Sequence, residues 1–342
     1  MEGIEGVLAD GNVRVVAVVG SSKNTGKTTT MNRILAGLPG DKGPYGVLSI
    51  GIDGEETDFW LRIDKPRIYV TPGTLIATGK KALTGGTASV SVIDVLGAPT
   101  PMGELALCRV EKAGAVLLCG VRHKADLDVA VRGLLAHGAV KVLVDGSYQR
   151  LAAADPTISQ GVILATGAVV GDTIQEVASR TREILDRLLL PEFEDKSVLD
   201  LMESAIRHGA PALSAADGGI TFLKDAGDPV APPETPGGGT SRGPMIAFPG
   251  AITDEWLRSV SRLGPGTHVI SSDPTRLFAS PESLAGFRSM GGRLTVIRGI
   301  RLLAVTVNPF SVTGASLPGP ELLEAVRAVA PGVPVFMFEG VQ

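Results

Sequence analysis

Short runs of β-branched and other apolar residues alternate along the chain with amphipathic stretches, in which apolar residues recur every three or four positions. The clearest examples predict strands over 14–19, 46–52, 141–144 and 161–165, and helices over 27–38, 126–137 and 172–189. Strands that alternate with helices in this way are typical of βαβ units. The pattern therefore predicts an α/β fold with a mostly parallel sheet.

This alternation stops near residue 190 and resumes after residue 243. Between these points lie a predicted helix over 198–208 and a stretch, 227–243, that is rich in Pro, Gly, Ser and Thr and nearly devoid of apolar side chains. We therefore expect three parts. They are a larger α/β domain over 1–190, a helix with a flexible linker over 191–243, and a smaller Rossmann-like α/β domain over 244–342.

Composition narrows the classes of function. The 342 residues carry a formal net charge of -4 without a basic block, so charge gives no reason to expect a nucleic-acid partner. The two cysteines, Cys108 and Cys119, are not spaced as zinc ligands. No apolar run approaches the roughly 20 residues of a membrane-spanning helix, and the acidic start does not resemble a signal peptide. We expect a cytoplasmic protein that does not bind membranes.

The strongest chemical signal is VVAVVGSSKNTGKTTT, residues 15–30, which follows a predicted strand and leads into a predicted helix. A phosphate-binding P-loop takes this position, because successive backbone N–H groups and the start of the helix surround an anion there. Gly26 would let the backbone approach a phosphate, Lys27 would bridge the β- and γ-phosphates, and Thr28 would place its hydroxyl on Mg²⁺. The segment departs from G-x-x-x-x-G-K-[ST], because its first glycine, Gly20, comes one residue too early.

We therefore predict that the domain over 1–190 is a P-loop nucleotide-binding domain that takes ATP and Mg²⁺. Its predicted nucleotide-binding residues are Ser22, Lys23, Asn24, Thr25, Gly26, Lys27, Thr28 and Thr29. No guanine-reading N-K-x-D motif is evident in the sequence, which favours ATP over GTP.

An acidic residue should complete the Mg²⁺ site, and the carboxyl ends of parallel strands are where such ligands gather. Asp145 in KVLVDG is the first choice, Asp53 in SIGID the second and Asp94 in VIDVLG the third. Each of them could instead be a solvated acid or a helix cap at a strand end. Together with Lys27, Asp145 and Asp53 are the predicted catalytic residues.

Other strand ends offer further candidates. Thr166 and Gly167 follow a predicted strand at a position where loops often contact a base, although a plain turn fits equally well. Asn308 follows a strand of the predicted second domain and could contact a ligand there, or could mark a simple chain reversal. The predicted loop 71–87 could receive a substrate beside the phosphate site.

Several segments together resemble the P-loop subunit of the lysine 5,6-aminomutase reactivase. They are GSSKNTGKTTT, SIGIDGEETD, KPRIYVTPGTLIATGK, VIDVLGAPTPMGEL, VLVDGSYQR with ILATGA, and AVTVNPFSVTG with VPVFMFEG, so the resemblance runs through most of the chain. It implies an ATP-dependent factor that restores an adenosylcobalamin- and pyridoxal-phosphate-dependent aminomutase, alongside a separate MutS-like ATPase subunit. Lys27 and Thr28 would then be nucleotide ligands, Asp145 the acid near Mg²⁺, and the second domain a partner-contact region. The sequence has no Asp-x-His-x-x-Gly signature of cobalamin binding.

Two other functions fit the same residues. One is a small-molecule ligase or kinase of the dethiobiotin-synthetase type, which would share the P-loop α/β core. The other is a nucleotide-binding adaptor with little hydrolysis, resembling the molybdopterin-guanine dinucleotide P-loop accessory protein. Dimers are common among related P-loop folds, so a homodimer is a further expectation.

Overall fold

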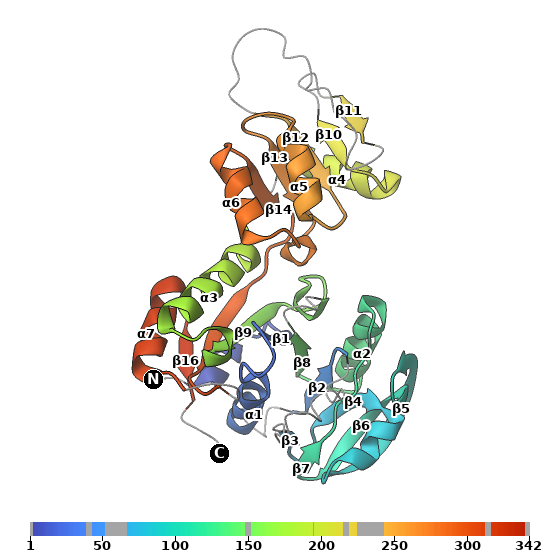
Figure 1. The fold of residues 1–342 in the computed structure, drawn as a ribbon. Helices are drawn as coiled ribbons and strands as arrows, with labels where there is room; N and C mark the ends of the chain where they lie inside the picture. The colour runs from blue at the N-terminus through green and yellow to red at the C-terminus, as the bar shows by residue number, and fades with distance from the viewer. Residues whose placement is uncertain are drawn as a thin grey trace. The chain divides into compact units, whose positions relative to one another are not determined.

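The protein is described by a computed structural model, shown as a ribbon in Figure 1. The described residues are 3–38, 43–51, 67–147, 152–193, 195–214, 219–223, 243–311 and 316–338. The chain divides into two compact units. Unit 1 consists of Met1–Ile184 together with Arg301–Gln342, and unit 2 consists of Leu185–Ile300.

Unit 1 is built on a nine-stranded sheet in the described part of the chain, with the order β16-β15-β9-β1-β8-β2-β4-β6-β5. Its strands are β1 (Val15–Gly20), β2 (Tyr45–Ser49), β4 (Leu75–Gly79), β5 (Ser89–Thr100), β6 (Gly103–Lys112), β8 (Lys141–Ser147), β9 (Gly161–Gly167), β15 (Leu302–Asn308) and β16 (Val335–Met337). Neighbouring strands from β16 to β4 are parallel, whereas β6 and β5 add an antiparallel hairpin at one edge. The prediction of an α/β fold with a mostly parallel sheet is confirmed.

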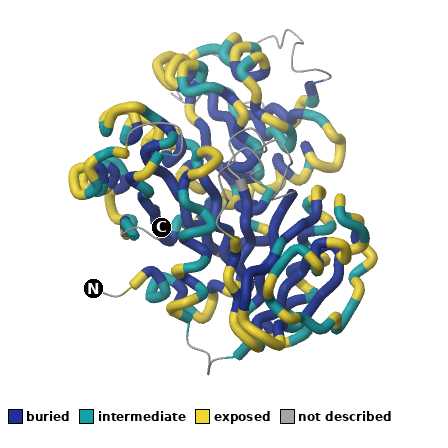
Figure 2. Tube along the Cα trace, turned by 60° about the horizontal axis from the view of Figure 1, so that its bottom comes forward, coloured by how far each residue is buried: buried dark blue, intermediate teal, exposed yellow. Residues whose placement is uncertain are grey.

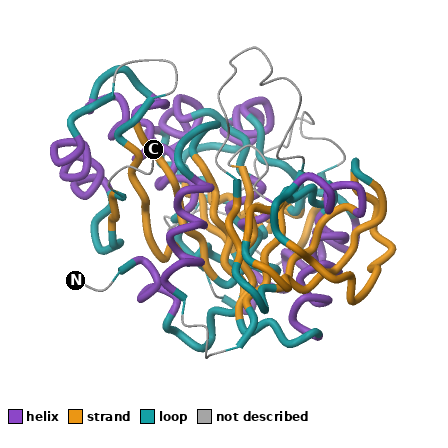
Figure 3. Tube along the Cα trace, turned by 90° about the horizontal axis from the view of Figure 1, so that it is seen from below, coloured by secondary structure: helices purple, strands orange, loops and turns teal. Residues whose placement is uncertain are grey.

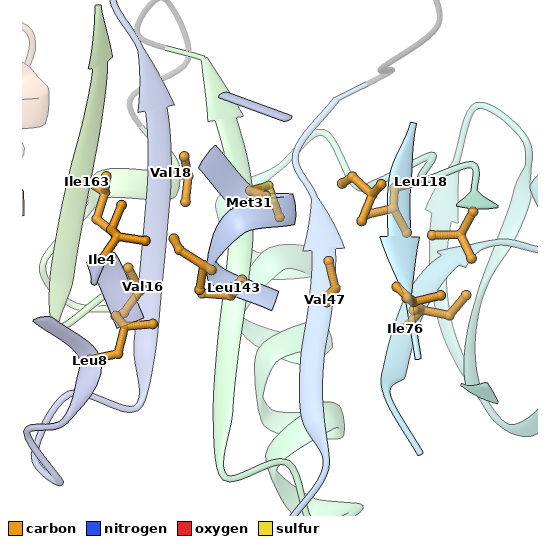
Figure 4. Close-up of a cluster of buried hydrophobic side chains, with 14 of the residues drawn as sticks. Ile4, Leu8, Val16, Val18, Met31, Val47, Ile76, Leu118, Leu143 and Ile163 are labelled. Atoms are coloured by element: carbon orange, nitrogen blue, oxygen red, sulfur yellow. The ribbon is translucent and has the colours of Figure 1, made fainter. Parts of the chain in front are cut away.

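Helices cover both faces of this sheet. They are α1 (Lys27–Gly37), α2 (Lys124–Ala136), α3 (Ile174–Leu188) and α7 (Gly319–Val329). Met31 of α1 belongs to the same core cluster as Val18 and Leu143, as Figure 4 shows. Leu134 of α2 instead lies beside Gly46 on the opposite face, 3.2 Å from the place where a Cβ on Gly46 would lie. A separate two-stranded sheet, β3 (Ile68–Val70) with β7 (Gly114–Val116), packs into the core on the α1 side.

The centre of the sheet is covered on both sides, which explains its composition. All six residues of β1 are buried, and the dark tube in Figure 2 marks the buried central strands. A strand buried on both faces has no polar-out positions, so it reads as a continuous apolar run such as VVAVVG. The loop that follows β1 therefore starts from a rigid strand in the middle of the sheet.

Unit 2 has a five-stranded sheet in its described residues, with the order β11-β10-β12-β13-β14. Its elements are α4 (Lys196–His208), β10 (Ala212–Ser214), β11 (Ile220–Phe222), β12 (Met245–Phe248), α5 (Asp254–Ser261), β13 (His268–Ser271), α6 (Pro281–Ser289) and β14 (Arg293–Val296). Ala247 and Ile270 pack with α4 in one cluster, whereas Ile246 and Val269 pack with α5 and α6 in another. Since neighbouring residues of a strand face opposite ways, α4 covers one face and α5 and α6 cover the other. Figure 3 distinguishes these helices from the strands by colour.

The division into units differs from the predicted domains 1–190, 191–243 and 244–342. Strand β15 pairs with β9 in parallel, so residues 301–342 complete the first sheet and do not belong to the second. Helix α4 and strand β10 belong to unit 2, where sequence reasoning expected a helix and a linker. Periodicity identifies a strand but not the sheet that it joins, which is why these boundaries were wrong. Most of the predicted linker 227–243 lies outside the described residues. No helix in the described part of the chain is long and apolar enough to cross a bilayer.

Candidate functional site

The loop Ser21–Gly26, called here the β1–α1 loop, joins the central strand β1 to helix α1. It lies at the carboxyl edge of the parallel strands β8, β1 and β9, which is where α/β sheets place their ligands. Two residues of the loop have positive φ angles, Asn24 at 61° and Gly26 at 89°. Gly26 is the residue directly before α1, so its freedom to adopt this conformation lets the chain turn from the loop into the helix.

Most backbone N–H groups of this loop have no hydrogen-bond partner within the described part of the protein. Those of Ser22 through Thr29 find no hydrogen-bond acceptor among the described residues. On either side the pairing resumes, because the Ser21 N–H donates to the Ala165 carbonyl at 2.8 Å and the Thr30 N–H donates to the Gly26 carbonyl at 2.8 Å. A run of open N–H groups at the start of a helix attracts anions, since the helix dipole adds partial positive charge there.

The side chain of Lys27 folds back along the loop. A Cβ placed on Gly20 would lie 2.8 Å from Lys27 Cγ and 2.9 Å from Lys27 Cδ, so the lysine stem lies directly over this glycine. Lys27 is half-buried, and its ammonium group has neither a hydrogen bond nor an ion pair with the described residues. Thr25 is buried and its hydroxyl donates to the Ser22 carbonyl at 3.1 Å, which closes the loop on itself. The stem of a cationic side chain thus lies along a loop in which most N–H groups lack partners among the residues described.

The remaining predicted ligands lie around the same loop. Ser22, Lys23 and Asn24 are exposed, and Thr28 and Thr29 are half-buried in the first turn of α1. The hydroxyls of Thr28 and Thr29 have no hydrogen bond with the described part of the chain. Every predicted loop residue is therefore brought together at one edge of unit 1.

Of the two predicted acids within the described residues, Asp145 lies nearer to this loop in the sheet. It is buried in β8, next to β1, and is paired with Val18 of β1 and Ser49 of β2. Residues paired across parallel strands face the same way, and Val18 packs with Met31 of α1. The Asp145 carboxylate therefore lies on the face of the sheet that α1 covers, below the end of β1.

The other two predicted acids, Asp53 and Asp94, are not found beside the loop in the described structure. Asp53 lies outside the described residues. Asp94 lies in β5 at the far edge of the sheet, five strand spacings from β1 and thus roughly 24 Å away along the sheet. It accepts a hydrogen bond from the Val95 N–H and lies 3.6 Å from His137, so the choice of Asp94 as a metal ligand is wrong. Within the described residues, no three His, Cys, Asp or Glu side chains gather into a metal site.

Two residues that sequence reasoning left uncertain also reach the loop. Thr166, at the end of β9, accepts a hydrogen bond from the Ser21 hydroxyl at 3.3 Å. Asn308, at the end of β15, packs against Gly26, since a Cβ on that glycine would lie 3.2 Å from Asn308 Cβ. Asn308 therefore belongs to unit 1, and the assignment of its strand to the second domain is wrong. Its place depends on the pairing of β15 with β9, which no local pattern reveals.

An ion pair with one buried partner connects α2 to the segment that follows β8. The ammonium of Lys124, the first residue of α2, contacts the buried carboxylate of Asp155. Burial raises the pKa of Asp155, but hydrogen bonds from Lys124 and Thr157 outweigh this effect and hold the pKa below its ordinary value. Asp155 is therefore ionised at neutral pH and links α2 to the segment after β8. Sequence reasoning missed this pair because its two residues are distant in the sequence.

Comparison of the chain with models of known protein families, with curated proteins and with solved structures found no match.

Proposed function

We propose that this chain is a P-loop protein that binds a nucleoside triphosphate with Mg²⁺ at the β1–α1 loop. The observation that carries the proposal is the run of open backbone N–H groups from Ser22 to Thr29 beside the Lys27 ammonium. Gly20 and Gly26 add to the fit, because neither carries a side chain that would fill the loop. A triphosphate tail has the charge and the many acceptor oxygens that such a loop can satisfy.

The roles of the surrounding residues follow from this arrangement. Lys27 binds and orients the β- and γ-phosphates, and Thr28 offers a hydroxyl oxygen to Mg²⁺. Asp145, below the end of β1, is the acid that holds a water or hydroxyl ligand of the cation in place. Mg²⁺ neutralises phosphate charge when it is bound. The lack of an evident N-K-x-D motif in the sequence supports ATP as the nucleotide.

The first experiment measures nucleotide affinity by titration calorimetry on the wild type and on Lys27→Ala. Loss of hydrogen bonds from a charged donor should weaken Mg·ATP binding by about 10- to 100-fold. Lys112→Ala is a matched control, because Lys112 is exposed at the end of β6, four strand positions from β1. Equal ATP affinity in the wild type and Lys27→Ala would overturn the assignment.

The acid is tested separately by Asp145→Asn. This variant should keep its affinity for ATP in the absence of Mg²⁺ but lose the gain in affinity and the hydrolysis that Mg²⁺ brings. If Asp145→Asn has no effect and Asp53→Asn removes hydrolysis, the order of the two acids must be reversed.

We further propose that the nucleotide drives the remodelling of a partner enzyme, in line with the resemblance to the aminomutase reactivase. The partner would be an adenosylcobalamin-dependent lysine 5,6-aminomutase, together with a MutS-like ATPase subunit. ATP turnover measured with and without these partners is the test, and stimulation by the inactivated aminomutase is the expected result. Stoichiometric product from a small acceptor would identify a ligase or kinase instead, and tight binding without turnover would identify an adaptor.

A further inference from the structure

The chain passes between unit 1 and unit 2 at two points, one inside a helix and one directly before a strand. The first crossing falls after Ile184, inside helix α3 (Ile174–Leu188). The second falls after Ile300, immediately before β15 (Leu302–Asn308). Both elements are fixed to the β1–α1 loop by contacts within unit 1.

Helix α3 is connected to the loop by a chain of hydroxyl groups. The Ser21 hydroxyl donates to Thr166 at 3.3 Å, the hydroxyls of Thr166 and Thr181 are 2.8 Å apart, and the Thr181 hydroxyl donates to the Val177 carbonyl at 2.7 Å. Each hydroxyl has one proton, so Thr181 must accept from Thr166. The bonds therefore all run in one direction, from the loop into α3, and such chains strengthen one another.

The link at the loop end is the weakest of the chain. An O–H···O bond usually measures about 2.7–2.8 Å, so the 3.3 Å between Ser21 and Thr166 leaves room to shorten. The other links are short, and both Thr166 and Thr181 are fully buried. These two inner links of the chain are therefore shielded from water.

Strand β15 has its own connections to the same region. The hydroxyls of Thr30 and Thr306 are 2.8 Å apart and both residues are buried, which ties the first turns of α1 to β15. At the end of the strand, Asn308 packs against Gly26. The two elements that enter and leave unit 2 are therefore both attached to the loop or to the helix that follows it.

We propose that Thr181 is a positioning residue that couples the β1–α1 loop to α3, so that nucleotide binding changes the local stability of unit 2. The proposal rests on the nucleotide function proposed above. Ligand binding and the conformation of α3 would then be thermodynamically linked. A ligand that closes the loop would favour the state of α3 in which the hydroxyl chain is shorter. Unit 2 would then be the part of the protein that responds to the nucleotide.

The experiment measures hydrogen–deuterium exchange of the full chain with and without Mg²⁺ and a non-hydrolysable ATP analogue. In the wild type, amides of α3 and of the unit 2 elements α4 to β14 should exchange at least about fivefold more slowly with the analogue. Thr181→Val removes the hydroxyl at nearly constant shape and should still bind the analogue, but the change in unit 2 should disappear. Thr181→Ser keeps the hydroxyl and should restore it.

Comparison of the free and bound forms within each variant separates coupling from a general loss of stability, which would speed exchange in both forms. Binding by the wild type with no change in unit 2 would overturn the coupling while leaving the nucleotide function intact. A full response in Thr181→Val would overturn the role of the hydroxyl chain. No binding of the analogue by the wild type would overturn the nucleotide function itself, and the role of Thr181 with it.

Discussion

Replacing Gly20 by alanine tests the loop geometry without removing any charged group. The added Cβ would lie 2.4 Å from Thr25 Oγ1, 2.8 Å from Lys27 Cγ and 2.9 Å from Lys27 Cδ. Carbon atoms in contact prefer about 3.5–4.0 Å, so the lysine stem must move by roughly 1 Å. The Thr25 hydroxyl must also move, although it closes the loop by donating to the Ser22 carbonyl.

Gly20→Ala should lower both the free energy of unfolding and the affinity for Mg·ATP. Overpacking commonly costs about 1–3 kcal/mol, and this variant should fall at the low end because the lysine stem can swing toward solvent. That same movement would displace the ammonium from the proposed phosphate position. Loss of hydrogen bonds from this charged donor should lower Mg·ATP affinity by about 10- to 100-fold, or about 1.4–2.8 kcal/mol.

Titration calorimetry gives the affinity, and thermal denaturation of the same samples shows whether Gly20→Ala remains folded. Gly11→Ala is the matched control, because a Cβ on Gly11 would have nothing within 4 Å. It should bind Mg·ATP as the wild type does. Wild-type affinity in a folded Gly20→Ala protein would refute the placement of the Lys27 stem over this glycine.

Two further predictions concern stability and thiol chemistry. The pKa of Asp155 is lower in the folded state than in the unfolded state, where it is near 3.8. The ion pair with Lys124 therefore stabilises the fold at pH values above 3.8, and this stabilisation is lost as the pH falls through the folded-state pKa. Asp155→Asn should therefore lower the free energy of unfolding by about 2 kcal/mol at pH 7 and have much less effect near pH 2. Urea unfolding at both pH values measures this difference. An equal loss of stability at both pH values would contradict the role of the charge. Burial raises the pKa of the Cys108 thiol to about 11, and Cys119 is buried as well, so both should resist an aromatic disulfide reagent at pH 8 until urea unfolds the protein; rapid reaction of the folded protein would contradict this burial.

The β1–α1 loop was predictable from sequence because all of its determinants are local. The apolar run of β1, the glycine with positive φ and the lysine at the start of α1 lie within 13 residues, 15–27. The place of Asp145 near the carboxyl end of a buried strand was predictable for a similar reason, because the apolar run before it is local. Its neighbours β1 and β2 in the sheet were not implied by the sequence.

The features that could not be predicted from the sequence depend on pairing between distant segments of the chain. Strand β4 was missed because Leu75–Gly79 is short, fully buried and set among turn residues, so it shows no alternation. Asp94 was misplaced because the β5–β6 hairpin runs to the edge of the sheet, far from its expected position. Asn308 was assigned to the wrong domain because the pairing of β15 with β9 spans the whole of unit 2.

The position of unit 2 inside the sequence of unit 1 has a consequence for synthesis on the ribosome. Strand β9 is made before residues 185–300, whereas its neighbour β15 is made after them. At about 5–20 residues per second, the intervening segment delays β15 on the order of ten seconds. During that interval the growing chain carries an open β9 edge, which is the kind of surface that recruits chaperones or joins neighbouring nascent chains.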